Sequence, residues 1–198
     1  MKIILATSNK GKVRELKEAM SEFEILTYNE LIEPFEIVED GKTFKENALI
    51  KARVVYEKLK NLKSLQNSEF IVLADDSGVS LPILGNKPGI YSARFAGEDA
   101  TSKDNMLKVI SELKVRKIKK TRAFYTASIA IVGKNGESTV HGWMHGDIID
   151  EFRGYRGFGY DPIFIPNGYD KTLGELPDEV KIKLSHRSKA INLIKKIL

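Results

Sequence analysis

The sequence contains no cysteine among its 198 residues. This absence excludes a disulfide framework, a thiolate zinc site and a cysteine nucleophile. Long apolar runs are also missing, because none approaches the roughly 20 residues that a membrane-spanning helix needs. Residues 1–6 are followed at once by polar residues, so we expect no signal peptide. Together these absences predict a cytoplasmic protein with no membrane partner.

The composition is that of a globular protein with a basic surface. Hydrophobic residues make up 42% and charged residues 30%, which supplies enough apolar material for a core. The length predicts a single domain over residues 1–198. Lys and Arg number 32 against 27 for Asp and Glu, a net charge of +5. This charge favours an anionic partner, and leaves nucleotide, nucleic acid and acidic lipid open.

Strand and helix patterns alternate in the first half of the chain. Short apolar or β-branched runs predict strands at 2–6, 23–27, 70–74, 122–132 and 138–150, the last two joined by a turn at Asn135-Gly136. Helical spacing and capping residues predict helices from Gly11, Thr43, Thr101 and Ser185. This order predicts an α/β fold with a mixed sheet flanked by helices, in which the basic segment 115–120 is an exposed connector.

A polar loop lies between the first predicted strand and helix. It contains Thr7, Ser8, Asn9, Lys10, Gly11 and Lys12. A helix N-terminus presents N–H groups that bind phosphate, and Lys12 adds a positive charge. The loop lacks the Walker pattern, so an ordinary strand–helix turn with solvated lysines is the alternative.

Paired carboxylates follow the strand predicted at 70–74. Asp75 and Asp76 are expected at its carboxyl end, on opposite faces, where one of them can hold a hard cation such as Mg²⁺. Glu39 is a second candidate ligand, and Lys51 lies on the polar side of a predicted helix and can reach a phosphate. The alternatives are a turn at Asp75–Gly78 and a solvated helix face at Lys51.

Two later segments suit a purine base. In the loop 157–162, an aromatic ring between glycines can stack on a base, and Asp161 can accept from base N–H groups. Lys181, His186 and Arg187 supply donors near the start of the last helix, with Ser185 as its N-cap. The alternatives are aromatic rings that complete the core and basic residues on a capped surface helix.

Other sequence patterns give little indication of a function. His141 and His145 share a strand face but lack a third nearby zinc ligand, and we expect no role for them. The nucleophile pattern G-x-S-x-G is absent. The basic run 114–122 has no accompanying nucleic-acid signature, so we expect no stable nucleic-acid partner.

Taken in order, the motifs resemble the inosine triphosphatase family of pyrophosphatases for noncanonical purine nucleoside triphosphates. The resemblance is carried by T-S-N-K-G-K, E-D-G-K-T-F-K-E-N-A, A-D-D-S-G, P-G-I-Y-S-A-R, G-F-G-Y-D-P-I-F and S-H-R, and extends from about residue 5 to residue 187. It implies hydrolysis of ITP, dITP and XTP to the monophosphate and pyrophosphate. It also implies Mg²⁺ dependence, with Mn²⁺ able to substitute, a homodimer, and an elongated mixed α/β fold with two lobes around a central nucleotide-binding cleft.

The resemblance also implies roles for individual residues. Glu39 and Asp76 match the metal-binding carboxylates, with Asp76 as the proton acceptor. Contacts to the triphosphate are implied for residues 7–12, Lys51 and Ser77. The purine pocket is implied to contain Phe158, Gly159, Tyr160, Asp161, Lys181, His186 and Arg187.

Two other functions fit parts of the pattern. One is a related pyrophosphatase for other modified nucleotides, which a substrate panel separates from the first. The other is a basic, non-catalytic nucleotide- or RNA-binding module, which explains the charge but gives Glu39 and Asp76 no purpose. For the purine enzyme, donors aimed at the 6-oxygen of hypoxanthine and xanthine would be left unpaired by adenine. His186, Arg187 or nearby backbone N–H groups are the candidate donors.

Overall fold

A computed structural model of the chain describes residues 1–66 and 68–198. Its described residues form a mixed sheet of seven strands in the order β2-β1-β3-β5-β6-β7, with β4 paired to β3. The first strand, β1 (Lys2–Leu5), is parallel to both β2 (Glu24–Thr27) and β3 (Phe70–Leu81). The remaining strands are β4 (Lys87–Pro88), β5 (Lys120–Gly133), β6 (Gly136–Ile149) and β7 (Phe164–Pro166), of which β4 and β7 are antiparallel to their partners. The predicted mixed α/β fold is confirmed.

The chain divides into two compact units, each built from separate segments. Unit 1 comprises residues 1–76, 127–141 and 190–198, and unit 2 comprises residues 77–126 and 142–189. The chain therefore passes from unit 1 to unit 2 between Asp76 and Ser77, inside β3. Both units are discontinuous in sequence. The single domain expected over residues 1–198 stays a prediction.

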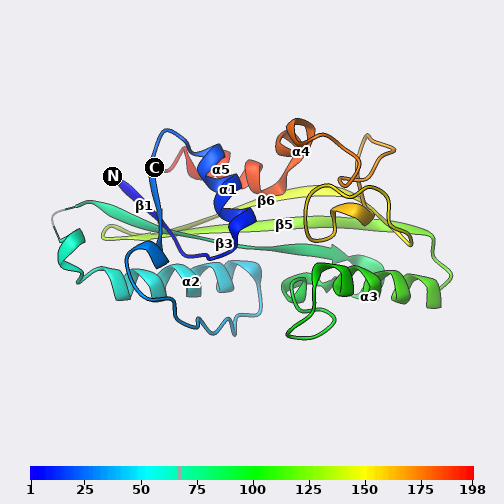
Figure 1. Cartoon of the computed structure of the whole chain (residues 1–198), viewed down its shortest axis with the longest axis horizontal. Helices are drawn as coiled ribbons and strands as arrows, with labels where there is room; N and C mark the ends of the chain where they lie inside the picture. Colours follow the sequence, from blue (N-terminus) through cyan, green and yellow to red (C-terminus); the bar gives the residue numbers. More distant parts are fainter. Residues whose placement is uncertain (67) are drawn as a thin grey trace. The chain divides into compact units, whose positions relative to one another are not determined.

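Unit 1 buries both faces of its part of the sheet. Helix α2 (Phe44–Leu59) packs on one face, where its side chains share a core with Val72 and Ala74 of β3. Helix α1 (Lys10–Ala19) and the end of α5 (His186–Ile194) pack on the other face, together with Leu73. Figure 1 shows α1 and α5 on one side of the strands and α2 on the other. Neighbouring residues of β3 thus point to opposite faces, as strand geometry requires.

Unit 2 has a separate core. Helix α3 (Ser102–Val115) contributes Met106, Val109 and Leu113, which pack with β5, β6 and β7 residues that include Tyr125 and Phe164. One further short helix is α4 (Asp178–Leu184). Short 3-10 turns among the described residues of both units are Tyr28–Glu30, Lys63–Leu65, Pro82–Leu84, Gly89–Tyr91 and Asp161–Ile163. Among the residues that the structure describes, no helix is long and apolar enough to cross a membrane.

Capping residues fix where the helices begin. Thr101 and Asp104 form a complete capping box at α3. Thr43 accepts from the Glu46 amide at the start of α2, but the Glu46 carboxylate accepts from Lys42 N, so the box predicted there is half formed. At α5, the Ser185 hydroxyl accepts from Arg187 N at 3.1 Å, which confirms the predicted N-cap.

Two predicted boundaries are wrong. The strand expected to end at Asp75 continues through Gly78 to Leu81, because Asp75 and Asp76 find lysine partners and stay buried, and β4 pairs with the strand's far end. Pairing with β1 does stop at Leu5 and Leu73, so the two carboxylates lie just beyond the carboxyl end of β1. The amphipathic helix predicted from Ser185, with Ile197 and Leu198 among its apolar residues, ends at Ile194, and Ile197 beyond it is half exposed.

Candidate functional site

Two lysine–carboxylate pairs flank β3 in unit 1. Asp75 and Asp76 follow each other along the strand and point to opposite faces, so each meets a different helix. Lys12 of α1 lies 2.8 Å from Asp75 Oδ2, and Lys51 of α2 lies 3.1 Å from Asp76 Oδ1. Both carboxylates are buried, Asp75 at 1% exposure and Asp76 at 8%. The structure therefore separates their roles, as the sequence predicts for neighbours on a strand.

Lys51 joins Asp76 to the second predicted metal ligand. Its Nζ donates to Glu39 Oε2 at 2.8 Å and to Asp76 Oδ1 at 3.1 Å, so three residues predicted from separate motifs meet at one point. Burial lowers the pKa of Lys51, but the charges of Asp76 and Glu39 outweigh it and raise that pKa above its ordinary value. The ammonium of Lys51 is therefore firmly charged.

Asp76 differs from an ordinary ion-paired carboxylate. Burial raises its pKa, and the attraction of Lys51 and Lys12 only partly opposes this shift. Its second oxygen, Oδ2, is buried and has no hydrogen-bond partner among the residues that the structure describes. A buried carboxylate oxygen without a donor is costly, which points to a ligand that is bound there in the working protein.

The loop at 7–12 is organised differently from the sequence expectation. Asn9 is the N-cap of α1, and its side-chain oxygen accepts from Gly11 N at 3.0 Å and Lys12 N at 3.1 Å. These are two of the helix N–H groups expected to bind phosphate. Asn9 N in turn donates to the hydroxyl of Thr7. The side chains of Ser8, Asn9 and Lys10 are exposed, and they remain the groups of this loop most open to an anion.

A second group of predicted residues meets in unit 2, around Arg187. This side chain is almost fully buried, at 2% exposure. Its Nη2 donates to the Ser77 hydroxyl at 2.9 Å, and its guanidinium carbon lies 5.8 Å from the centroid of the Phe158 ring. Phe158 itself remains 43% exposed. The guanidinium is thus held from two sides beside an exposed aromatic ring.

Tyr160 and Asp161 stabilise the loop that carries the Phe158 ring. The Tyr160 ring is buried in the core of unit 2, and its hydroxyl donates to the backbone carbonyl of Ser92 at 2.8 Å. Asp161 accepts from Phe158 N at 3.2 Å, and Lys181 Nζ lies 3.9 Å from Asp161 Oδ2. The sequence left two roles open for the aromatic rings of this loop. Tyr160 completes the core, whereas the exposed ring of Phe158 can stack on a base.

Sequence reasoning missed Tyr125, which lies behind the predicted base residues. Its ring stacks on the ring of His186, with centroids 4.7 Å apart and an interplanar angle of 13°. Its hydroxyl lies 3.5 Å from Asp161 Oδ1. Burial raises its pKa well above the ordinary value, so the hydroxyl stays protonated and donates. The sequence signal was a single tyrosine on a buried strand, next to Phe124.

Asn47 is another residue that the pattern did not single out. It is buried on α2, and its side-chain oxygen accepts from Gly41 N at 2.9 Å. A Cβ at Gly41 would lie 2.6 Å from that oxygen, so the close approach requires glycine. This contact ties the segment that carries Glu39 to the helix that carries Lys51.

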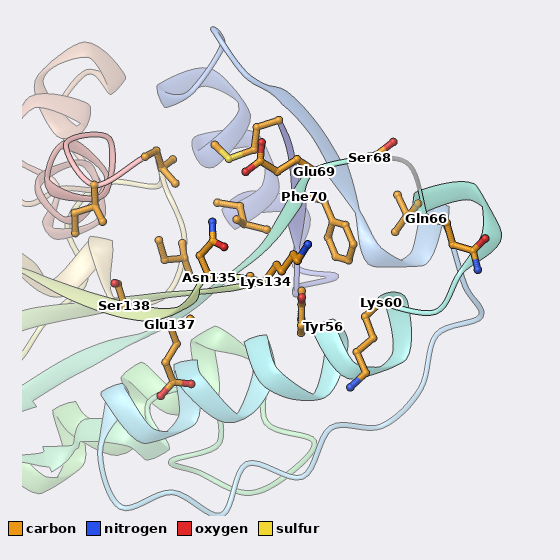
Figure 2. Close-up of a pocket in the computed structure, with 18 residues that line it drawn as sticks. Tyr56, Lys60, Gln66, Ser68, Glu69, Phe70, Lys134, Asn135, Glu137 and Ser138 are labelled. Carbon is orange, nitrogen blue, oxygen red and sulfur yellow. The ribbon is translucent and has the colours of Figure 1, made fainter.

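Histidines and open hollows elsewhere do not form part of these groups. Within residues 1–66 and 68–198, no group of three or more His, Cys, Asp or Glu side chains is arranged to hold a metal. A hollow of about 890 Å³ lies in unit 1, lined by residues that include Tyr56, Phe70 and the β5–β6 turn. Figure 2 shows these residues as sticks. None of the predicted site residues lines it.

The chain belongs to the Ham1 family, whose model matches residues 3–197. It is similar to the dITP/XTP pyrophosphatase of Nautilia profundicola, at 61% identity over 98% of this chain and 95% of the relative. It is also similar to that of Sulfurovum sp., at 58% identity over 100% and 93%. The solved Ham1 protein of Staphylococcus aureus superimposes with a TM-score of 0.86 at 35% identity, over 100% and 97%. These matches confirm the resemblance that the motifs carry.

Proposed function

We propose that this protein hydrolyses dITP, XTP and ITP to the nucleoside monophosphate and pyrophosphate, and so removes deaminated purines from the nucleotide pool. The observation that carries the proposal is the meeting of Glu39, Lys51 and Asp76 at one point, with a buried Asp76 oxygen left without a donor. High identity to proteins named dITP/XTP pyrophosphatase supports the choice of substrate.

A divalent cation fits the carboxylates of this group. Glu39 and Asp76 present oxygens to a common point, and oxygen ligands are those that Mg²⁺ prefers. The unpartnered Oδ2 of Asp76 offers a further oxygen. We propose that these two residues hold Mg²⁺, or Mn²⁺ in its place. When bound, the metal would neutralise phosphate charge and polarise the P–O bonds.

The protein's own groups would supply the rest of the reaction. Lys12 and Lys51, with the exposed polar residues of the 7–12 loop, would bind and neutralise the triphosphate. Asp76 would orient the attacking water and accept its proton as a general base. A bond forms between the water oxygen and the α-phosphorus as the bond from that phosphorus to the pyrophosphate oxygen breaks.

Base recognition would belong to the group in unit 2. Phe158 offers an exposed ring for stacking, and Arg187 and His186 offer donors to the 6-oxygen of hypoxanthine or xanthine. Adenine carries an amino group at that position, which cannot accept a hydrogen bond from them. Sites of this type discriminate by about 10⁴–10⁵. Ser77 would orient Arg187 through their hydrogen bond.

A product analysis tests the proposal. We would incubate the protein with dITP, XTP, dGTP, dATP and dCTP, with and without Mg²⁺, and separate the products by chromatography. The expected result is dIMP and pyrophosphate from dITP, only with metal, with dATP almost untouched. Release of free phosphate and dIDP would move the point of attack and contradict the assignment. Turnover of modified pyrimidines alone would favour a related pyrophosphatase, and binding without turnover would favour a non-catalytic module.

Two further proposals follow from the family. Because nucleoside triphosphates are the substrates, we propose that the protein acts in the cytoplasm. We also propose that it is a homodimer, which light scattering of the purified protein would test directly.

A further inference from the structure

We propose that Lys51 is an exchangeable counter-ion, which partly neutralises Glu39 and Asp76 until a metal takes its place. The inference rests on the proposed function, because it assigns the metal to the same two carboxylates. Lys51 Nζ lies 2.8 Å from Glu39 Oε2 and 3.1 Å from Asp76 Oδ1. It therefore occupies the point between two carboxylates that a cation bound to both would need.

The charges do not allow both cations to share that point. Two carboxylates and one ammonium leave a net charge of −1, whereas adding a divalent cation beside an unmoved Lys51 would give +1. The repulsion between a divalent ion and the ammonium is twice that between two unit charges at the same distance, and it is screened little at a buried site. A metal bound to both carboxylates would therefore expel Lys51.

An expelled Lys51 needs a new anion. The side chain is buried on the α2 face of β3, so its ammonium would be costly to leave without a partner. The triphosphate of the substrate supplies that partner. The exchange couples the two ligands: metal binding frees Lys51 for phosphate, and phosphate frees the carboxylates for metal. By linkage each ligand raises the affinity for the other, so the metal and the triphosphate are expected to bind together.

Lys12 provides the contrast that makes the inference specific. It also pairs with a buried aspartate of β3, at 2.8 Å from Asp75 Oδ2, but on the opposite face. Its ammonium also approaches the backbone oxygen of Asp75, at 3.3 Å. No second carboxylate of unit 1 is paired with Lys12 among the described residues, so it fills no two-carboxylate site. Removing Lys12 deletes the same charge without opening the Glu39–Asp76 pair.

Metal titration without nucleotide tests the exchange. We would titrate Mn²⁺ into the wild-type protein, Lys51→Met and Lys12→Met, and follow binding by calorimetry and by the paramagnetic signal of free Mn²⁺. Lys51→Met is expected to bind Mn²⁺ at least about tenfold more tightly than the wild type, since 1.4 kcal/mol of lost competition suffices. Lys12→Met also removes a charge that attracts Asp76, but no ammonium leaves the Glu39–Asp76 pair, so its gain should be clearly smaller than that of Lys51→Met. Unchanged affinity in Lys51→Met, or equal gains in both variants, would overturn the proposal.

A second measurement uses the unaltered chain, in case Lys51→Met does not fold. In protein with ¹⁵N-labelled lysine, the Nζ resonance of Lys51 is expected to be protected from solvent by its two carboxylates. Saturating Mg²⁺ together with imidodiphosphate, an uncleavable pyrophosphate analogue, should shift that resonance, as the ammonium moves from carboxylate to phosphate. A resonance that stays in place at saturation would show that Lys51 keeps its partners and would refute the exchange.

The two proposals fail separately. Neither metal binding nor the lysine resonance requires turnover, so both report on the exchange alone. If the wild type cleaves dITP but Lys51→Met gains no metal affinity, only the exchange is wrong. If the metal data are as expected but no nucleotide is cleaved, the exchange stands and the proposed function fails.

Discussion

At the scale of single residues, Asp76 shows how the candidate site lowers the stability of the folded chain. Its raised pKa means that its charged form is less favourable in the folded than in the unfolded chain. The folded state is therefore more stable with Asp76 neutral than with Asp76 charged. The attraction of Lys51 and Lys12 only partly offsets the free-energy cost of burying the charge. A residue kept charged at such a cost is one whose charge serves a ligand or a reaction.

Replacing Asp76 should therefore separate stability from activity. In chelator at neutral pH, Asp76→Asn is expected to unfold at the same or a higher temperature than the wild type. Its hydrolysis of dITP should fall by about 10²–10⁴-fold, the usual contribution of a general base. Thermal unfolding and initial rates measure the two effects. The matched control is Asp104→Asn, because the pKa of that exposed capping carboxylate is lowered by its bonds to Thr101 and the change should reduce stability. A clear loss of stability in Asp76→Asn would contradict this account.

Tyr125 is a positioning residue by the same reasoning, since it touches His186 and Asp161 from behind. Tyr125→Phe keeps the stack but removes a long hydrogen bond, which is worth about 0.5–1 kcal/mol, so KM for dITP should rise by about two- to fivefold with kcat little changed. Tyr125→Leu also removes the stack and should raise KM further. Steady-state kinetics on dITP and dATP provides the measurement. A fall in kcat at constant KM in the Phe variant would argue against a role in holding the base pocket.

At the scale of elements, the base loop depends on glycines with left-handed backbone. Gly157 has φ +81°, and a Cβ there would lie 1.9 Å from Asp161 Oδ2. Gly159 has φ +61°, and a Cβ there would meet nothing within 4 Å. The two positions share the backbone requirement, and only the first also constrains the side chain that accepts from Phe158 N.

This difference gives a paired prediction. Gly157→Ala and Gly159→Ala should each lose about 1–2 kcal/mol from the left-handed backbone. Gly157→Ala must also displace Asp161, so its KM for dITP should rise about tenfold or more, whereas Gly159→Ala should raise KM much less. Denaturant unfolding and initial rates test both effects. Equal KM values in the two variants would show that the hydrogen bond from Phe158 N to the Asp161 carboxylate does not position the Phe158 ring.

The elements themselves were largely readable because their signals are local. The strand at 2–6, the capped helices at Thr43 and Thr101 and the hairpin around residue 135 are set by periodicity and turn residues within a few positions. The prediction that the strand ended at Asp75 was wrong because two adjacent aspartates usually mark a turn. Only the lysines from α1 and α2, distant in sequence, allow the carboxylates to remain inside a strand.

At the scale of the whole molecule, the order of the motifs predicted which residues belong together, but not their partners. The motifs implied Glu39 and Asp76 as a metal-binding pair and Lys51 as a contact to the triphosphate, and the structure places the Lys51 ammonium between the two carboxylates. Motif spacing could not show that Asn9 caps its own helix or that Tyr125 lies against His186. The contact of Tyr125 with His186 depends on how a strand and a helix that are distant in sequence pack together, which a single sequence does not encode locally. The Asn9 cap, by contrast, is local, and an asparagine just before a predicted helix is the signal that could have indicated it.

The net charge of +5 is also a property of the whole molecule, and it should show in the kinetics. A basic protein attracts a multiply charged triphosphate over a distance set by screening, about 30 Å at 0.01 M salt and about 8 Å at 0.15 M. We therefore expect kcat/KM for dITP to fall as salt rises across this range, with kcat changing less because the bound substrate is already paired. Lys117→Gln combined with Lys119→Gln removes two exposed charges from unit 2 outside both residue groups, and should lower kcat/KM at low salt while leaving kcat intact. A salt-independent kcat/KM would mean that the overall charge plays no part in capturing the substrate. The lysines beside the site would then act only once the triphosphate is bound.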